Sequence, residues 1–219
     1  MDSDTMTSPG QFQKIFEEFG SGQIDILLGT QMVAKGLDFP RVSLVGVVSA
    51  DTSLTLPDFR AAERTFQLVV QVAGRAGRGQ TAGEVVVQTL HESEPAIQFA
   101  ATHDYQGFAA SELPLRREMG FPPYSRMVRM IVRHENVTQA AQDADRLGKS
   151  VAAVLPSQIL MQGPMPCGVR KIRNVFRYQI LLTAERAGWI QQFLSPRLGD
   201  LCRDLEAEVI ADVDPIALL

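Results

Sequence analysis

The sequence predicts a mixed α/β protein in two parts, an α/β part built on parallel strands and a smaller α+β part that follows it. Two observations carry this prediction. Up to about residue 91, short and almost purely apolar runs alternate with segments of helical periodicity, as in a parallel sheet covered on both faces by helices. Beyond residue 123, strand and helix patterns follow one another in the order β-α-β-β-α-β.

The first part is expected to begin with a helix. Ser8 and Pro9 form a favourable helix start, apolar residues then recur at helical spacing, and glycines at 20 and 22 end the pattern. Asp58 can cap a second helix, whose far end leads into residues 71–78. The predicted elements of this part are a helix over 8–19, strands over 24–28 and 42–48, a helix over 58–70 and a strand over 84–88.

Residues 92–123 are predicted to form a helical connector, broken at Pro114 and ended by residues 120–123 (GFPP). In the strand that follows, residues 126, 128, 130 and 132 point to one face and residues 127, 129, 131 and 133 to the other. One of these faces is expected to be more exposed to water. The predicted elements are strands over 126–133, 159–165, 175–183 and 208–213, and helices over 138–155 and 190–205, the last broken at Ser195-Pro196. This order is the split βαβ, ferredoxin-like arrangement.

Composition and charge exclude several classes of protein. The 219 residues suffice for one large or two modest domains, and the net charge of −4 means that DNA contact would need a local basic surface. The two cysteines, Cys167 and Cys202, are isolated, which excludes a disulfide framework and offers no metal site. The histidines His91, His103 and His134 are expected to be ordinary surface or loop residues. With neither a bilayer-spanning run nor a signal peptide, we expect a cytoplasmic protein that has no membrane partner.

Two glycine-containing segments carry the strongest functional signal. Residues 29–40 read GTQMVAKGLDFP, and residues 71–78 read QVAGRAGR, in which Arg75 and Arg78 each follow a glycine. A guanidinium stays protonated and presents a planar fork of donors, so it can neutralise charge that builds up on a transferring phosphate. Glycine lets the backbone come close to a ligand. Taken alone, the second segment is also typical of a polar helix end, where arginines favour the negative end of the helix dipole.

In order and spacing, the two segments resemble motifs V and VI of superfamily 2 helicases, which lie on the second RecA-like lobe of these ATP-driven motors. The resemblance implies a partial helicase lobe 2 over 1–91, the connector over 92–123 and a separate C-terminal domain over 124–219. It also implies that Arg78 is the arginine finger that stabilises the transition state, and that Arg75 helps to hold the γ-phosphate of ATP.

The same resemblance divides the other motif residues between nucleotide and DNA. Hydroxyl, amide and ammonium groups just past a strand end commonly hold the phosphates of a nucleic-acid backbone. A plain loop-to-helix cap is the alternative, and for Lys35 a solvated charge explains the residue nearly as well. Nucleotide contacts are expected from Gly36, Asp38 and Gln71, and DNA contacts from Thr30, Gln31 and Lys35.

Basic residues are concentrated in residues 170–178 (RKIRNVFRY) of an otherwise acidic chain. Cations that alternate with aromatic rings suit single-stranded DNA, because bases stack on rings while cations hold phosphates. We therefore assign Arg173 and Arg177 as candidate DNA contacts. A solvated hairpin, or an edge strand that uses basic residues to prevent unwanted pairing, would show the same pattern.

The match extends beyond these motifs to one helicase family. Residues 58–65 (DFRAAERT), 120–124 (GFPPY) and 212–215 (DVDP), taken with the two motifs, resemble the PriA family over nearly the whole chain. The resemblance implies a bacterial 3′-to-5′ DNA helicase that uses ATP and Mg²⁺ and acts on single-stranded or forked DNA at abandoned replication forks. It implies single-stranded DNA-binding protein and other primosome proteins as partners, and zinc held by clustered cysteines.

The chain departs from the family pattern in several respects. It lacks the phosphate loop, the Asp-Glu-x-His box that holds Mg²⁺, the zinc cysteines and the N-terminal DNA-binding domain. We therefore expect the C-terminal portion of a PriA-like helicase, either a truncated gene product or a fragment, without ATPase activity of its own. The alternative is a non-catalytic module that binds DNA or a primosome partner. An incomplete lobe also predicts an uncovered strand edge and exposed apolar surface in the first part.

Overall fold

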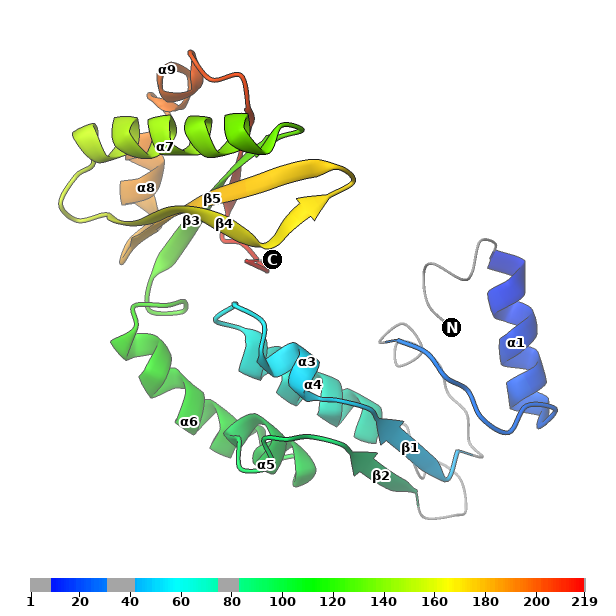
Figure 1. Ribbon diagram of the computed structural model, residues 1–219. Coiled ribbons are helices and arrows are strands. Elements are labelled where there is room, and N and C mark those ends of the chain that lie inside the picture. Colours follow the sequence, from blue (N-terminus) through cyan, green and yellow to red (C-terminus); the bar gives the residue numbers. More distant parts are fainter. Residues whose placement is uncertain (1–8, 31–41, 75–82, 219) are drawn as a thin grey trace. The chain divides into compact units, whose positions relative to one another are not determined.

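The computed structural model describes residues 9–30, 42–74 and 83–218, which form two compact units (Figure 1). Unit 1 is drawn from Met1–Thr55 and Ala62–Phe108, and unit 2 from Leu56–Ala61 and Ala109–Leu219. Two helices, α4 (Ala61–Ala73) and α6 (Tyr105–Glu118), contribute residues to both units.

Unit 1 is built on a pair of parallel strands. The two strands pair with Val45 opposite Val85, and α3 and α4 lie on the connection between them, because parallel strands need a crossover. Inside the unit, the ring of Phe66 on α4 stacks on Phe108 of α6, with centroids 4.6 Å apart. The other elements of unit 1 are α1 (Pro9–Ser21), β1 (Leu44–Val47), α3 (Asp51–Leu54), β2 (Glu84–Val87) and α5 (Pro95–Ala101).

The predicted strand over 24–28 is wrong. These residues have no regular secondary structure, and Ile26 and Leu28 are 76% and 74% exposed. A strand needs a neighbour for its backbone N–H and C=O groups, and in the described part of the chain β1 and β2 pair only with each other. The apolar run therefore remains at the surface. The other predicted elements of this part agree with the structure to within a few residues.

Unit 2 has the predicted ferredoxin-like topology. Its four strands form an antiparallel sheet in the order β4-β5-β3-β6, so the first and third strands of this unit lie at the centre. Helices α7 and α8 pack against one face of this sheet (Figure 1). The elements are β3 (Arg126–His134), α7 (Val137–Val154), β4 (Leu160–Ile172), β5 (Val175–Ala184), α8 (Ala187–Leu194), α9 (Leu198–Cys202) and β6 (Glu208–Val213).

The wetter side predicted for β3 is absent, because both faces of the strand are covered. Residues 127–132 are all buried, including the arginine Arg129, which is only 2% exposed. The face turned away from α7 is closed by two segments that are distant in sequence, residues 56–61 and the tail 214–218. They form an apolar cluster with this face, made of Met127, Leu181, Leu218, Phe59, Phe121 and Met165.

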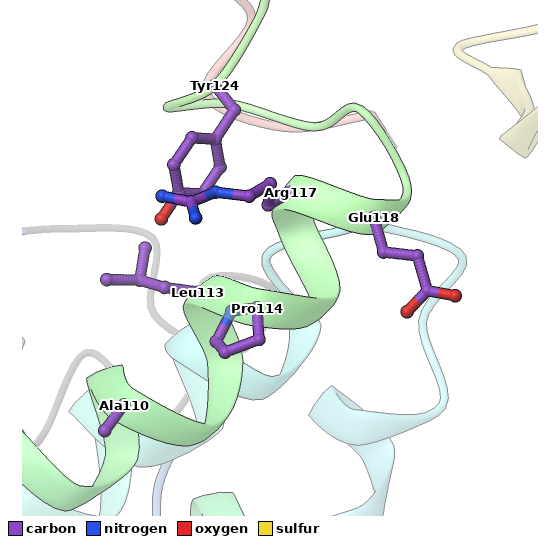
Figure 2. Close-up of a pocket in the computed structure, with 6 residues that line it drawn as sticks. All are labelled: Ala110, Leu113, Pro114, Arg117, Glu118 and Tyr124. Atoms are coloured by element: carbon purple, nitrogen blue, oxygen red, sulfur yellow. The ribbon is translucent and has the colours of Figure 1, made fainter.

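The break predicted at Pro114 is also wrong, because α6 runs through this proline without interruption (Figure 2). A proline inside a helix removes one backbone hydrogen bond, at a cost of about 3 kcal/mol. Here the proline lies on an exposed position, so the carbonyl that loses its partner can be hydrated. The helix instead ends at Glu118, and Gly120, two residues further on, has a φ of 66°, the left-handed conformation that glycine adopts most easily.

A buried carboxylate joins α7 to the start of β6. Asp143 accepts hydrogen bonds from the N–H groups of Glu206 and Ala207 at 3.0 and 2.9 Å, and from the Gln139 amide at 3.0 Å. Burial alone would raise the pKa of Asp143. The bonds from Ala207, Gln139 and Glu206 outweigh burial, so the pKa is lowered and the carboxylate remains charged.

Candidate nucleotide and DNA sites

Most residues of the two helicase-like motifs lie outside the residues that the structure describes. Their assigned roles therefore stay predictions from the sequence. The residues concerned are Gln31, Lys35, Gly36, Asp38, Arg75 and Arg78.

The two remaining motif residues lie on different segments of unit 1. Thr30 is exposed, in a bend that follows the irregular run from residue 24. Gln71 is half-buried in the last turn of α4. The helix ends directly beyond it, where the N–H of Gly74 donates to the Val70 carbonyl at 3.0 Å. Helix α4 thus fixes Gln71 at its end, immediately before the arginine motif.

The basic residues 170–178 form the tip of the β4-β5 hairpin, drawn in yellow in Figure 1. Ile172 pairs with Val175 across a two-residue turn, in which Arg173 and Asn174 have φ values of 46° and 68°. Two positive φ values are the signature of a type I′ turn, which matches the twist of a hairpin. Arg173 is therefore exposed at the tip, together with Arg170 and Lys171, and Arg177 is half-buried on β5.

The aromatic residues of this hairpin are partly covered by other side chains. Tyr178 packs against the core cluster beneath α7 and α8. The ring of Phe176 is half-buried and is covered by the Lys171 ammonium, which lies 4.7 Å from the ring centroid. Base stacking on these rings stays a prediction, and the exposed Arg170, Lys171 and Arg173 present positive charge at the tip.

A polar cluster that sequence reasoning missed joins the ends of β1 and β2 in unit 1. Oδ1 of Asp51 accepts from the Thr89 hydroxyl at 2.8 Å and lies 2.8 Å from Nδ1 of His91, and Oδ2 accepts from the Leu90 N–H at 3.0 Å. These hydrogen bonds, led by that of His91, lower the pKa of Asp51 to about 2. His91 is a surface residue, as expected, but its partner is 40 residues away, so no local pattern could reveal the pair.

A shallow pocket of about 450 Å³ lies beside α6 in unit 2. Figure 2 shows the guanidinium of Arg117 over the ring of Tyr124, 4.5 Å from its centroid, at one side of this pocket. The residues that line it are Ala110, Leu113, Pro114, Arg117, Glu118 and Tyr124.

No group of three or more histidine, cysteine, aspartate or glutamate side chains lies close enough to hold a metal ion within residues 9–30, 42–74 and 83–218. Across these ranges, no helix combines the length and the apolar character needed to span a bilayer.

Two protein-family models match two separate parts of the chain. Residues 2–80 match the helicase conserved C-terminal domain, which is the second RecA-like lobe of helicases. Residues 117–216 match the primosomal protein N C-terminal domain. The fold predicted from the sequence, a partial RecA-like lobe followed by a ferredoxin-like domain, is thereby confirmed.

Curated relatives match over the full length of the chain. The replication restart protein PriA of Bacillus subtilis is 40% identical over 222 residues, which are 100% of this chain and 28% of the relative. PriA of Treponema pallidum is 40% identical over 100% of this chain and 33% of its own length, and PriA of Synechocystis is 36% identical over 99% and 26%. The chain spans about a quarter to a third of the length of these relatives. It therefore belongs to the PriA family of replication restart proteins, and it matches the C-terminal part of that family's members.

Proposed function

We propose that the chain supplies one side of an ATP-driven DNA-unwinding site. Arg78 acts as the arginine finger, and Arg75 helps to hold the γ-phosphate of an ATP bound by a lobe that carries a phosphate loop. The observation that carries the proposal is the similarity of the whole chain to replication restart proteins. The helicase-domain match over residues 2–80, which includes both arginines, supports it further.

The remaining motif residues are divided in this proposal between the two ligands. Support comes from the exposure of Thr30, which a DNA contact requires, and from the position of Gln71 directly before the arginine motif. The nucleotide side is completed by Gly36, Asp38 and Gln71, and the DNA backbone is contacted by Thr30, Gln31 and Lys35.

ATP and Mg²⁺ are the cofactors of the complete motor in this proposal, which translocates 3′ to 5′ on forked DNA in the cytoplasm. Single-stranded DNA-binding protein and other primosome proteins are its partners. The chain alone does not hydrolyse ATP, because its sequence holds no phosphate loop whose backbone N–H groups and lysine would cradle the phosphates. Turnover of ATP by the purified chain on addition of DNA would contradict this point.

The arginine-finger role is tested in a chimera, in which this chain replaces the matching C-terminal part of the Bacillus subtilis relative. We expect Arg78→Ala to lower DNA-stimulated ATP turnover by about a thousandfold or more, because an arginine finger stabilises charge only in the transition state. Arg203→Ala is the matched control, since this exposed arginine pairs with Asp200 at the surface of α9. Wild-type turnover in the Arg78→Ala chimera would overturn the proposal.

A second candidate function is DNA binding without catalysis, through the β4-β5 hairpin. It is favoured by the exposure of Arg170, Lys171 and Arg173 on one hairpin of a chain whose net charge is −4. Phosphate contacts of this kind hold DNA without reading its sequence. Arg177, which is half-buried on β5 next to this tip, adds a fourth cation.

Binding of a fluorescent forked DNA to the 219-residue chain, measured by anisotropy over a series of salt concentrations, tests this second function. We expect Arg173→Glu to weaken binding and to reduce the salt dependence by about one phosphate contact. Arg203→Glu carries the same charge change away from the hairpin and should leave both quantities near wild type. Equal effects of the two substitutions would show that only overall charge matters.

A further inference from the structure

The tail of the chain lies against the segment that opens helix α4. Residues 56–61 and the tail both belong to unit 2, where they cover the sheet face opposite α7 and α8. The ring of Phe59 stacks on Phe121 with centroids 5.3 Å apart, and Leu218 is buried in the same apolar cluster. This packing brings the two segments together on the surface of one sheet.

Two buried polar side chains hold a single peptide group of the tail. Nη1 of Arg129 donates to the Ala217 carbonyl at 3.0 Å, and the N–H of Leu218 donates to Oδ2 of Asp58 at 2.9 Å. That carbonyl and that N–H belong to the same peptide bond. Arg129, Asp58 and Leu218 are all buried, so both hydrogen bonds are shielded from water, and bonds to charged groups are then stronger than neutral ones.

The same carboxylate shapes the start of α4. Oδ1 of Asp58 accepts from the Arg60 N–H at 2.9 Å, and its main-chain carbonyl accepts from the N–H of Ala61, the first residue of the helix. The Arg60 guanidinium reaches the Ile216 carbonyl at 3.5 Å. One aspartate therefore joins the first turn of α4 to the tail.

We propose that tail residues 216–218 are a positioning element for residues 58–61, which open α4, and that Asp58 and Arg129 are its positioning residues. We call this arrangement the clasp. Every contact of the clasp lies within unit 2, and the clasp does not depend on the proposed function.

Hydrogen exchange of the 219-residue chain, measured by mass spectrometry, tests the clasp. Three variants are compared with wild type: deletion of residues 216–219, Asp58→Ala, and both changes together. We expect each single change to speed exchange at the start of α4, residues 61–67, by about tenfold or more, since a buried hydrogen bond to a charged group is lost. The combined variant should speed exchange by clearly less than the product of the two single effects, because the Leu218–Asp58 hydrogen bond is lost in both.

Two outcomes overturn the proposal. Additive effects would mean that Asp58 acts only on its local turn with Arg60, and unchanged exchange over 61–67 would mean that the tail does not hold the start of α4. Peptides from α7, on the opposite face of the sheet, report whether each variant is still folded.

A milder variant keeps the test decisive if the deletion unfolds unit 2. Asp58→Asn has nearly the same volume but leaves one acceptor oxygen for two backbone donors. It should also speed exchange over 61–67, whereas Asp214→Asn, at an exposed carboxylate 3.6 Å from Arg126, should not. Wild-type exchange in a folded Asp58→Asn chain would overturn the proposal. Because no nucleotide enters this experiment, its result is independent of whether Arg78 is an arginine finger.

Discussion

The guanidinium of Arg129 donates to Oε1 of Gln179 at 2.6 Å across the buried face of the antiparallel sheet. Both side chains are buried between the sheet and the tail, so neither can exchange this bond for one to water. Arg129 therefore satisfies two acceptors at once, the Gln179 amide on the neighbouring strand and the Ala217 carbonyl of the tail.

Replacing this arginine should be costly. We expect Arg129→Met to lower the free energy of unfolding by about 3 kcal/mol, because the side-chain volume is nearly kept while two buried acceptors lose a charged donor. Arg133→Met is the matched control on the same strand, since the Arg133 guanidinium pairs with Glu208 at the surface and should matter little. Urea unfolding followed by circular dichroism measures both, and equal losses would contradict the prediction.

The Asp51 cluster should make unit 1 sensitive to acid. The folded-state pKa of Asp51 is depressed to about 2 from an ordinary value of 3.8, so its contribution to stability is fully present above about pH 4. It is lost as the pH falls through 2, because the protonated group no longer accepts from Thr89, Leu90 and His91 as a carboxylate does. We therefore expect Asp51→Asn to destabilise the chain at pH 6, and the difference from wild type to shrink between pH 4 and pH 2. A constant difference across this range would show that charge at Asp51 is irrelevant.

Helix α7 is expected to tolerate no side chain at Gly148. A Cβ atom placed there would lie 2.8 Å from Cδ of Pro164 on β4, well inside van der Waals contact. We expect Gly148→Ala to destabilise unit 2 by about 1–3 kcal/mol, since a packed core resists overfilling. Gly188 in α8 has open space at the same point, so Gly188→Ala should be neutral or slightly stabilising. Thermal unfolding of the two variants distinguishes a local clash from a general effect of alanine.

Much of unit 2 could be predicted from its sequence because its signals are local. Apolar periodicity places β3, α7 and β6 nearly at their observed limits, and their order alone selects the ferredoxin-like topology. The environment of Arg129 could not be predicted in this way. Alternation along β3 indicates two unequal faces, but whether water covers one of them depends on segments about 70 residues before and 88 residues after this arginine.

Unit 1 and its candidate site were less accessible to sequence reasoning. An apolar run such as 24–28 has strand composition, yet strand formation depends on a neighbour that composition does not reveal. The motif residues could be recognised from their order and spacing. The bonds of Asp51 to residues 89–91, by contrast, follow from the crossover that brings the ends of β1 and β2 together.

The two units should differ in how readily they open. Unit 1 has only two paired strands among the described residues, and Leu44 and Val86 are exposed on the same face of that pair, so little apolar burial opposes local unfolding. Unit 2 has four strands with β3 buried on both faces.

We therefore expect amides of β1 and β2 to exchange with solvent much faster than those of β3 and β5 at neutral pH. Hydrogen exchange on the unmodified chain measures this directly. The edge strand β4 is the internal control, because it pairs on one side only but belongs to the more stable unit 2. Equal protection of β1 and β3 would mean that the uncovered apolar face of the partial helicase lobe does not weaken it.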